Sequence, residues 1–375
     1  MKKDLSRRDF IKSATGMAIA TGALLLPGEE AEAQEKGYTS PVEARHYIKL
    51  KKKVVQCQRC PNLCKLKPGE RSFCRTRVNK NGKLYTYAYG NPCAVHIDPV
   101  EKKPLFHFLP GTEMLSIATA GCTFRCKYCQ NWEISQFRPE ETVNFALSPE
   151  EVVNLALERK TPSIASTYSE PTAFYEYMYD ISKLARKKGI RPTMHSNGCI
   201  NTEPLEELCE YLDAANIDLK FFSDEKYDRI SHGYFGTVLD TLETLHKKNV
   251  HLEITNLVVP TLNDDGKEIR KMASWIMQHL GPDVPLHFSR FYPMYKLKNL
   301  PPTPVSTLEL AREIAMEAGL NYVYIGNVPS NEGENTYCPE CGKAIIKRIG
   351  YIINENNIKN GKCGFCGREI EGVWE

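Results

Sequence analysis

Short apolar runs alternate with helical stretches from about residue 114 to residue 327, and this alternation most constrains the fold. Each run is long enough for one strand, and each helical stretch can cross back over a sheet. We therefore predict an α/β fold whose right-handed crossovers curl a parallel sheet into a partial (β/α)6-type TIM barrel. The predicted strands span residues 115–119, 163–168, 191–196, 214–220, 251–259 and 285–291, with residues 322–325 as a candidate seventh.

The helices between these strands carry ordinary start and stop signals. Residues 148–151, Ser-Pro-Glu-Glu, form a capping box with proline at the first helical position. In such barrels, functional groups gather at the C-terminal ends of the strands. The other predicted helices span residues 173–188, 203–212, 237–248, 265–280 and 306–319.

A tight loop with three cysteines, Cys122, Cys126 and Cys129, follows the first predicted strand with the spacing C-x3-C-x2-C. Thiolates are soft ligands that favour iron–sulfur clusters, zinc or Cu(I). A saturated 4Fe-4S cluster takes four cysteines, so three leave one iron open for chemistry. A zinc knuckle or a ferredoxin loop is the alternative, but each needs a fourth ligand, and none stands close by.

Polar side chains fall at the ends of three further predicted strands. Glu170 follows the second strand, where a helix N-terminus would also favour an acid. Residues 196–198, Ser-Asn-Gly, follow the third and could equally be a helix cap with a turn glycine. Asp218 and Lys220 end the fourth strand, and a buried salt bridge would also explain them.

Four more cysteines lie in a small N-terminal module that we place at residues 38–110. Their spacing, C-x2-C-x3-C-x9-C, can close a metal site for structural zinc or an auxiliary iron–sulfur cluster, and buried thiols without a ligand are the third reading. Residues 84–89 alternate as a strand does. His107 has no partner at ligand spacing, so we expect it to be structural. The four cysteines are Cys57, Cys60, Cys64 and Cys74.

A second metal module is predicted at residues 335–375, where the spacing is C-x2-C-x21-C-x2-C. Both cysteine pairs end in glycine, which frees the backbone to turn. This pattern favours a zinc ribbon, with an auxiliary iron–sulfur cluster or rubredoxin-like iron as alternatives. The ligands would be Cys338, Cys341, Cys363 and Cys366.

The N-terminus reads as a targeting segment, residues 1–33. Ser6-Arg7-Arg8-Asp9-Phe10 is a twin-arginine pattern, followed by an apolar run too short to span a membrane. Ala31-Glu32-Ala33 fits a cleavage site. We expect export to the periplasm or cell envelope, with the cytoplasm as the alternative.

The composition indicates which general classes of protein this chain can belong to. The chain has 375 residues, of which 42% are hydrophobic, enough for a large core. A formal net charge of +3 gives no reason to expect a nucleic-acid partner. Eleven of the 14 cysteines fall in the three clusters, which indicates metal sites rather than a disulfide framework.

The loop at residues 121–132, with an aromatic residue before its last cysteine, resembles the radical S-adenosylmethionine (SAM) superfamily. Residues 98–105, Asp-Pro-Val-Glu-Lys-Lys-Pro-Leu, and residues 119–135 look most like the radical SAM protein of the AmmeMemoRadiSam system, which is related to pyruvate formate-lyase activating enzymes. The resemblance covers nearly all of the chain after residue 33.

This resemblance implies roles for particular residues. The three loop cysteines would hold a 4Fe-4S cluster whose open iron chelates SAM. Glu170 matches a Gly-Gly-Glu-Pro element that holds the SAM ammonium, although Tyr168 and Ser169 replace the glycines. The complete set of implied cofactor-binding residues is Tyr128, Ser169, Glu170, Ser196, Asn197, Asp218, Lys220 and Val259.

The resemblance also implies a reaction and partners. We expect reductive cleavage of SAM and hydrogen abstraction from an unidentified substrate, for which His287 and Arg290 are candidate contacts. A flavodoxin- or ferredoxin-type electron donor is implied, and Memo-like and AMMECR-like proteins are candidate partners. The narrower alternative is a glycyl-radical-enzyme activase. From another class, a non-catalytic iron–sulfur electron carrier would need no SAM pocket.

Overall fold

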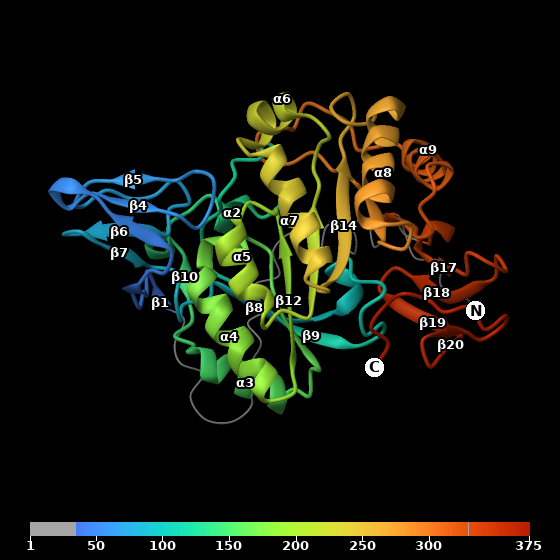
Figure 1. Cartoon of the computed structure of the whole chain (residues 1–375), viewed down its shortest axis with the longest axis horizontal. Coiled ribbons are helices and arrows are strands. Elements are labelled where there is room, and N and C mark those ends of the chain that lie inside the picture. Colours follow the sequence, from blue (N-terminus) through green and yellow to red (C-terminus); the bar gives the residue numbers. More distant parts are fainter. Residues whose placement is uncertain (1–34, 329) are drawn as a thin grey trace, which may run out of the picture. The chain divides into compact units, whose positions relative to one another are not determined.

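The computed structural model describes residues 35–328 and 330–375 (Figure 1). The predicted signal peptide lies outside these residues. No helix in this part of the chain is long and apolar enough to cross a membrane.

A sheet of eight strands organises the described chain. Seven strands are parallel, and β8 pairs antiparallel with β9 at one edge. The sheet runs from β16 to β8 in the order β16-β15-β14-β13-β12-β11-β9-β8, which confirms the α/β fold with a partial, barrel-like sheet. Its strands are β8 (Ala94–Pro99), β9 (Glu113–Ala118), β11 (Ser163–Ser166), β12 (Arg191–Ser196), β13 (Ala214–Asp218), β14 (His251–Val258), β15 (Leu286–Arg290) and β16 (Val323–Gly326).

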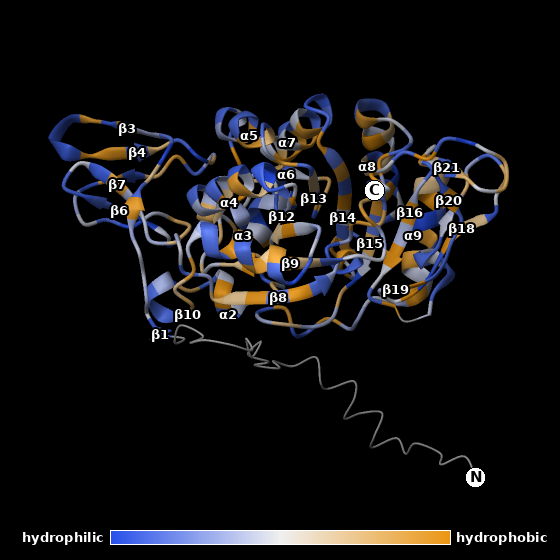
Figure 2. Ribbon diagram, turned by 90° about the horizontal axis from the view of Figure 1, so that it is seen from below, coloured by the Kyte–Doolittle hydropathy of each residue, from blue (hydrophilic) through white to orange (hydrophobic). Residues whose placement is uncertain are grey.

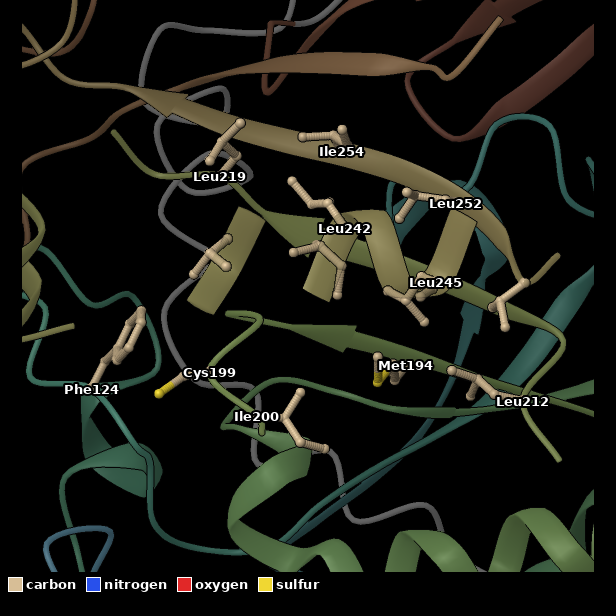
Figure 3. Close-up of a cluster of buried hydrophobic side chains, with 14 of the residues drawn as sticks. Phe124, Met194, Cys199, Ile200, Leu212, Leu219, Leu242, Leu245, Leu252 and Ile254 are labelled. Atoms are coloured by element: carbon tan, nitrogen blue, oxygen red, sulfur yellow. The ribbon is translucent and has the colours of Figure 1, made fainter. Parts of the chain in front are cut away.

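Helices connect successive parallel strands and follow one another along the sheet from green to orange in Figure 1. Both hydrophilic and hydrophobic residues colour each helix in Figure 2, as amphipathic helices require. Figure 3 shows side chains of α7, β14 and β12 gathered in the core between helices and sheet. The connecting helices are α3 (Pro149–Glu158), α4 (Tyr175–Lys187), α5 (Thr202–Cys209), α7 (Phe235–Lys247), α8 (Gly266–Leu280) and α9 (Val305–Glu317).

The predicted strands and helices match these elements to within a few residues. Two unpredicted elements matter for the site. One is β8, which the sequence pattern did not separate from the N-terminal module, and which adds an antiparallel strand to the central sheet. The other is the short helix α6 (Asp224–Lys226), which continues into the π-turn η6 (Tyr227–Ser231). A single π-turn leaves no periodic signal in a sequence.

Residues after β8 pack against the face of the sheet that the helices leave free. Leu105, Phe108 and Leu109 form a small core with Met114 of β9 and Ala214 of β13, together with Val100 and Ala165. The short helix η3 (Val100–Lys102) lies between β8 and β9, and the short helix α2 (Trp132–Ser135) follows β9 in the sequence. The segment between β8 and β9 therefore fills one side of the open barrel.

His107 sits inside this filling segment, as a structural residue would. Its two ring nitrogens lie 2.7 Å from the Glu371 carbonyl and 2.6 Å from the Tyr324 hydroxyl. Burial lowers the pKa of His107 to about 4.

Because of this histidine, the free energy of unfolding should decrease as the pH decreases. An unfolded histidine takes up a proton near pH 6.5, whereas folded His107 stays neutral down to about pH 4. The unfolded state thus gains protons first, and the stability present above about pH 6.5 is lost as pH falls towards 4, approaching about 3 kcal/mol. Denaturant unfolding at pH 7 and pH 4.5 should show a smaller pH dependence for His107→Gln than for wild type. Equal dependence in both proteins would contradict this assignment.

The N-terminal module, drawn in blue in Figure 1, consists of two three-stranded antiparallel sheets. The strand predicted over residues 84–89 ends earlier, at Thr86. A buried ion pair, Arg77 to Glu176 at 2.6 Å, ties the module to α4. The strands are β2 (Val42–Glu43), β6 (Arg77–Lys80) and β7 (Lys83–Thr86) in one sheet, and β3 (Tyr47–Lys49), β4 (Val55–Cys57) and β5 (Lys65–Leu66) in the other; β1 (Glu35–Lys36) pairs with β10 (Val143–Asn144).

The C-terminal module is a three-stranded antiparallel sheet followed by a two-stranded ribbon. Ile345 and Ile370 of this module share a buried cluster with Phe106, Tyr322 and Tyr324 of the barrel. The strands are β17 (Thr336–Tyr337), β18 (Ala344–Ile349) and β19 (Ile352–Asn356) in the sheet, and β20 (Ile358–Lys359) and β21 (Lys362–Cys363) in the ribbon.

Candidate functional site

The three-cysteine loop begins where β9 ends, at the C-terminal edge of the parallel strands. Gly121 opens the loop with φ +101°, a conformation that favours glycine. A Cβ atom there would lie 2.6 Å from the Cys74 carbonyl oxygen of the N-terminal module. The loop can therefore turn here only because residue 121 is glycine, and it turns against the N-terminal cysteines.

The loop is held in place by the π-turn η6. The backbone amides of Arg125 and Lys127 donate to the carbonyls of Ser231 and Ile230, at 2.8 and 3.1 Å. Gly233 lies so close to the Phe124 ring that a Cβ would approach it to 2.5 Å. The unpredicted turn thus serves to fix the cysteine loop.

The loop thiols are buried or nearly so and receive hydrogen bonds. The Phe124 amide and the Asn197 side-chain amide lie 3.3 and 3.6 Å from Cys122 Sγ. Cys129 Sγ lies 3.2 Å from the Ser135 hydroxyl. Burial raises the pKa of the Cys129 thiol to about 11 and that of Cys122 well above its usual range. Such thiols become thiolates when a metal neutralises their charge, so this donor set fits an iron–sulfur cluster.

Glu170 meets the loop through Ser196 and Asn197, all three of which the sequence predicted. Its carboxylate accepts hydrogen bonds from the Ser196 hydroxyl at 2.7 Å, the Asn197 amide at 2.9 Å and the Thr172 amide at 2.9 Å. The Asn197 side chain then reaches both Cys122 Sγ and the Thr123 hydroxyl. Burial raises the pKa of Glu170 above its ordinary value. An acid beside the cysteines is therefore oriented by three donors.

Asp218 and Lys220 form the salt bridge that was the alternative reading of this pair. Lys220 Nζ lies 2.7 Å from one Asp218 oxygen, and His195 Nε2 lies 3.2 Å from the other. The Asp218 carboxylate raises the pKa of Lys220, and the Cys126 thiol adds to this effect, so the lysine lies near the loop. Burial within the same region raises the pKa of Tyr128.

The remaining predicted site residues are placed as follows. Ser169 donates its hydroxyl to the Thr119 carbonyl at 2.7 Å. The Val259 amide donates to Asn263 Oδ1 at 2.6 Å. His287 is buried against Glu253, 2.7 Å away, and Arg290 donates to the Thr303 carbonyl at 2.7 Å. His287 therefore belongs to the packed interior of the sheet rather than to an open site.

The motif beginning at Asp98 builds a charged cluster next to this site. Lys102 and Lys103 both pair with the Asp98 carboxylate, and the Tyr168 hydroxyl donates to it. Burial lowers the pKa of Lys103 to about 8. Tyr168 directly precedes Ser169, so this motif supports the segment that carries Glu170.

The N-terminal cysteines come together in one place, and each sulfur has a hydrogen-bonding neighbour. These neighbours are Arg77 Nη1 for Cys57 (3.7 Å), Asn62 Nδ2 for Cys60 (3.6 Å), the Phe73 amide for Cys64 (3.4 Å), and the Ser72 and Thr76 hydroxyls for Cys74 (3.0 and 3.1 Å). Burial raises the pKa of Cys64 to about 11, and the other three thiols act on it in the same direction.

The C-terminal cysteines form a tighter group. All four sulfurs lie within 4.8 Å of one another, and Cys338 to Cys366 and Cys341 to Cys363 are separated by 3.6 and 3.8 Å. Gly342 and Gly367, at φ +69° and +82°, turn the two knuckles, as the sequence predicted. This group can bind a metal.

Several residues that complete these sites carried no sequence signal. Asn62 and Arg59 lie among the N-terminal cysteines, and Asn263 ties the end of β14 to the Lys220 carbonyl at 2.8 Å. Cys199, outside the three clusters, contacts Cys60. Each acts through a contact between distant segments, which residue spacing does not reveal.

Comparisons with known proteins agree with this geometry. The Radical SAM superfamily model matches residues 116–275. An uncharacterized protein of Methanocaldococcus jannaschii is 47% identical over 335 residues, covering 88% of this chain and 99% of that one. The pyruvate formate-lyase-activating enzyme of Clostridium pasteurianum is 28% identical over 166 residues, covering 42% of this chain and 66% of the relative.

A radical SAM methyltransferase structure from Sphaerobacter thermophilus aligns with a TM-score of 0.47 at 14% identity, covering 60% of this chain and 71% of that chain. The matched family region begins within β9 and includes the cysteine loop, Glu170, Ser196, Asn197 and Lys220. The chain therefore contains a radical SAM domain over residues 116–275 and is homologous, over part of its length, to pyruvate formate-lyase activating enzymes.

Proposed function

We propose that this protein is an enzyme that cleaves SAM reductively and abstracts hydrogen from a substrate. The observation that carries the proposal is the continuous network from Glu170 through Ser196 and Asn197 to Cys122 Sγ. An electron carrier would need cysteines but no buried carboxylate aligned beside them. When bound, a 4Fe-4S cluster and SAM would together supply the electron transfer and the radical chemistry.

Different residues of this chain would bind the cluster and the separate groups of SAM. Cys122, Cys126 and Cys129 would hold the cluster. Glu170, oriented by its three donors, would accept the SAM ammonium, a charge-assisted contact in a buried site. Ser196, Asn197, Asp218 and Lys220 would serve the carboxylate and ribose, Val259 would lie near the adenine, and Tyr128 and Ser169 would complete the pocket. Tyr128, Glu170, Ser196, Asn197 and Val259 are buried, whereas Ser169, Asp218 and Lys220 are half-buried. The buried side chains also exclude water from the reacting atoms.

EPR spectroscopy tests the proposal. The reduced protein should give a cluster signal that changes when SAM is added, because SAM would occupy the open iron. A variant with C122A, C126A and C129A should lose the part of the signal that responds to SAM. A wild-type signal that stays unchanged with saturating SAM would contradict the proposal.

The narrower alternative is activation of a glycyl-radical enzyme, and the name of the relative from Clostridium pasteurianum favours it. An activase would leave a persistent radical on the backbone of a partner protein. An enzyme acting on a small molecule would leave none, and would instead couple 5′-deoxyadenosine to substrate consumption.

Sequence motifs also support a proposal for the cellular setting. We propose that the protein is the radical SAM member of an AmmeMemoRadiSam system, with Memo-like and AMMECR-like partners and a flavodoxin- or ferredoxin-type donor. The twin-arginine pattern supports export after the clusters are loaded, since that route carries folded proteins. Location in a cell fractionation, with and without the substitution of Arg7 and Arg8 by lysine, tests export.

The C-terminal cysteines are proposed to hold zinc. Tetrahedral zinc with Zn–S bonds of about 2.3 Å places its sulfurs about 3.8 Å apart, close to the separations of 3.6 and 3.8 Å found here. Metal analysis should therefore find about one zinc per chain, lost in a C338A/C341A variant and retained in C209A, whose cysteine lies outside the clusters. Retention of zinc in the first variant would rule out this assignment.

A further inference from the structure

The N-terminal cysteine site lies directly against the loop that carries the radical cluster. Asn62 donates one hydrogen bond to Cys60 Sγ, at 3.6 Å, and one to the Thr123 carbonyl, at 3.3 Å. Thr123 is the neighbour of Cys122 in the chain. A single side chain therefore connects a sulfur of one cysteine set to the backbone beside a sulfur of the other.

Arg125 makes a second, independent connection. Its guanidinium donates to the Cys122 carbonyl at 3.0 Å and to the Phe73 carbonyl, and it stacks 3.8 Å above the Phe73 ring. The Phe73 amide in turn donates to Cys64 Sγ at 3.4 Å. Two short paths of hydrogen bonds thus join the two cysteine sets, which a site with a purely structural role in its own module would not require.

Positive charge is buried around the N-terminal cysteines. Arg59 is 1% exposed, donates to the Ala173 carbonyl at 3.3 Å, and its Nε atom has no hydrogen-bond partner among the described residues. Arg77, also buried, contacts Cys57 Sγ, but its charge is already balanced by Glu176 at 2.6 Å. Arg59 lies beside Cys57, Cys60 and Cys74. A buried guanidinium is stable only beside negative charge, so the position of Arg59 favours thiolates that bind an anionic metal centre.

The spacing of the sulfurs separates this site from the C-terminal one. All four C-terminal sulfurs lie within 4.8 Å of one another, as ligands of a single metal ion require, whereas the N-terminal cysteines form no such group among the described residues. A single tetrahedral zinc holds its sulfurs at about 3.8 Å. A cluster of several irons spreads its cysteine ligands farther apart, so the N-terminal set suits a cluster better than a single zinc.

The surface around this site is strongly basic. Residues 41–90 contain 13 lysines and arginines, of which nine are exposed and two, Arg59 and Arg77, are buried, but only two acidic residues, although the whole chain has a net charge of +3. Lys65 and Lys67 are exposed on either side of buried Leu66, close in sequence to Cys64, and Leu63 and Phe73 are exposed hydrophobic residues nearby in the chain. Such a surface would attract an acidic protein and bring it near the metal site.

We propose that Cys57, Cys60, Cys64 and Cys74 hold a redox-active iron–sulfur cluster that receives electrons from an acidic carrier protein and passes them to the radical cluster. The carrier, of the flavodoxin or ferredoxin class, gives up one electron and leaves oxidised. The same electron crosses by way of Asn62 and Arg125 to the cluster of Cys122, Cys126 and Cys129, so that no bond is formed or broken and no proton moves. This inference rests on the proposed function and specifies its source of electrons.

Metal content tests the identity of the site. In the full chain with C122A, C126A and C129A, reconstituted without oxygen, we expect about four iron atoms per chain and a cluster EPR signal after reduction with dithionite. Loss of all iron from this variant, with about two zinc atoms per chain, would overturn the proposal and leave the radical SAM assignment intact.

Reduction by a protein tests the electron path. With a reduced acidic flavodoxin at low salt, K65E/K67E should form 5′-deoxyadenosine about 10-fold more slowly than wild type, because the attraction to the carrier is reversed. With dithionite, the two rates should agree within about 2-fold. The matched control K187E/K188E, at the exposed end of α4, should behave as wild type with both reductants. Equal slowing of both charge variants with flavodoxin would overturn the docking surface. Absence of product from wild type with dithionite would instead defeat the proposed function itself.

Discussion

Glu170→Gln is expected to weaken SAM binding by about 10- to 100-fold, because it removes a buried charge-assisted contact while keeping the shape of the side chain. The three donors around the carboxylate leave little freedom for the site to reorganise. The dissociation constant of SAM for the cluster-loaded protein measures the effect. The exposed Glu150→Gln on α3 is the control and should bind as wild type does.

The pH dependence of SAM binding should have a definite sign. Burial raises the pKa of Glu170 above that of an ordinary carboxyl group, so the acid takes up a proton at a higher pH. SAM affinity should therefore fall as pH falls, and begin to do so above the usual carboxyl range. Unchanged affinity in Glu170→Gln, or a wild-type affinity that rises as pH falls, would contradict the role of Glu170.

Glu176→Ala is expected to destabilise the protein by about 3–5 kcal/mol, because it leaves the Arg77 guanidinium buried without its carboxylate. The side chains of Arg77 and Glu176 are 0% and 4% exposed, and the pair joins the N-terminal module to α4. The free energy of unfolding in denaturant measures the loss.

An exposed ion pair in the same module provides the control. Lys83 and Glu43 lie 3.0 Å apart with more than two fifths of each side chain exposed, so Glu43→Ala should reduce stability far less than Glu176→Ala does. Replacing both partners of the buried pair, as R77M/E176L, should recover part of the lost stability. Equal costs for Glu176→Ala and Glu43→Ala would show that the buried pair does not fasten the module.

The sequence predicted what depends on local pattern. Strands such as β12 and helices such as α8 follow from apolar runs and caps, and the C-terminal knuckles follow from cysteine spacing and glycine. Glu170 and Ser196 were proposed as site residues because they lie at or just after the ends of parallel strands, where such groups converge.

Contacts between distant segments could not be predicted in this way. The bridges made by Asn62 and Arg125 join residues that are 61 and 52 positions apart, and neither side chain has a spacing that marks it. The antiparallel strand β8 was hidden because its neighbour in the sheet is decided by tertiary packing rather than by its own pattern. His287 looked like a substrate contact on its strand, yet Glu253 of the adjacent strand β14 and the Phe106 ring enclose it.

The most direct test of the central claim is formation of 5′-deoxyadenosine. Protein beginning at Gln34 would be reconstituted without oxygen, mixed with dithionite and SAM, and compared with the C122A/C126A/C129A variant. We predict product from wild type and only the protein-free background from the variant. No product from a wild-type protein that carries an intact 4Fe-4S cluster would contradict the assignment and favour an electron carrier.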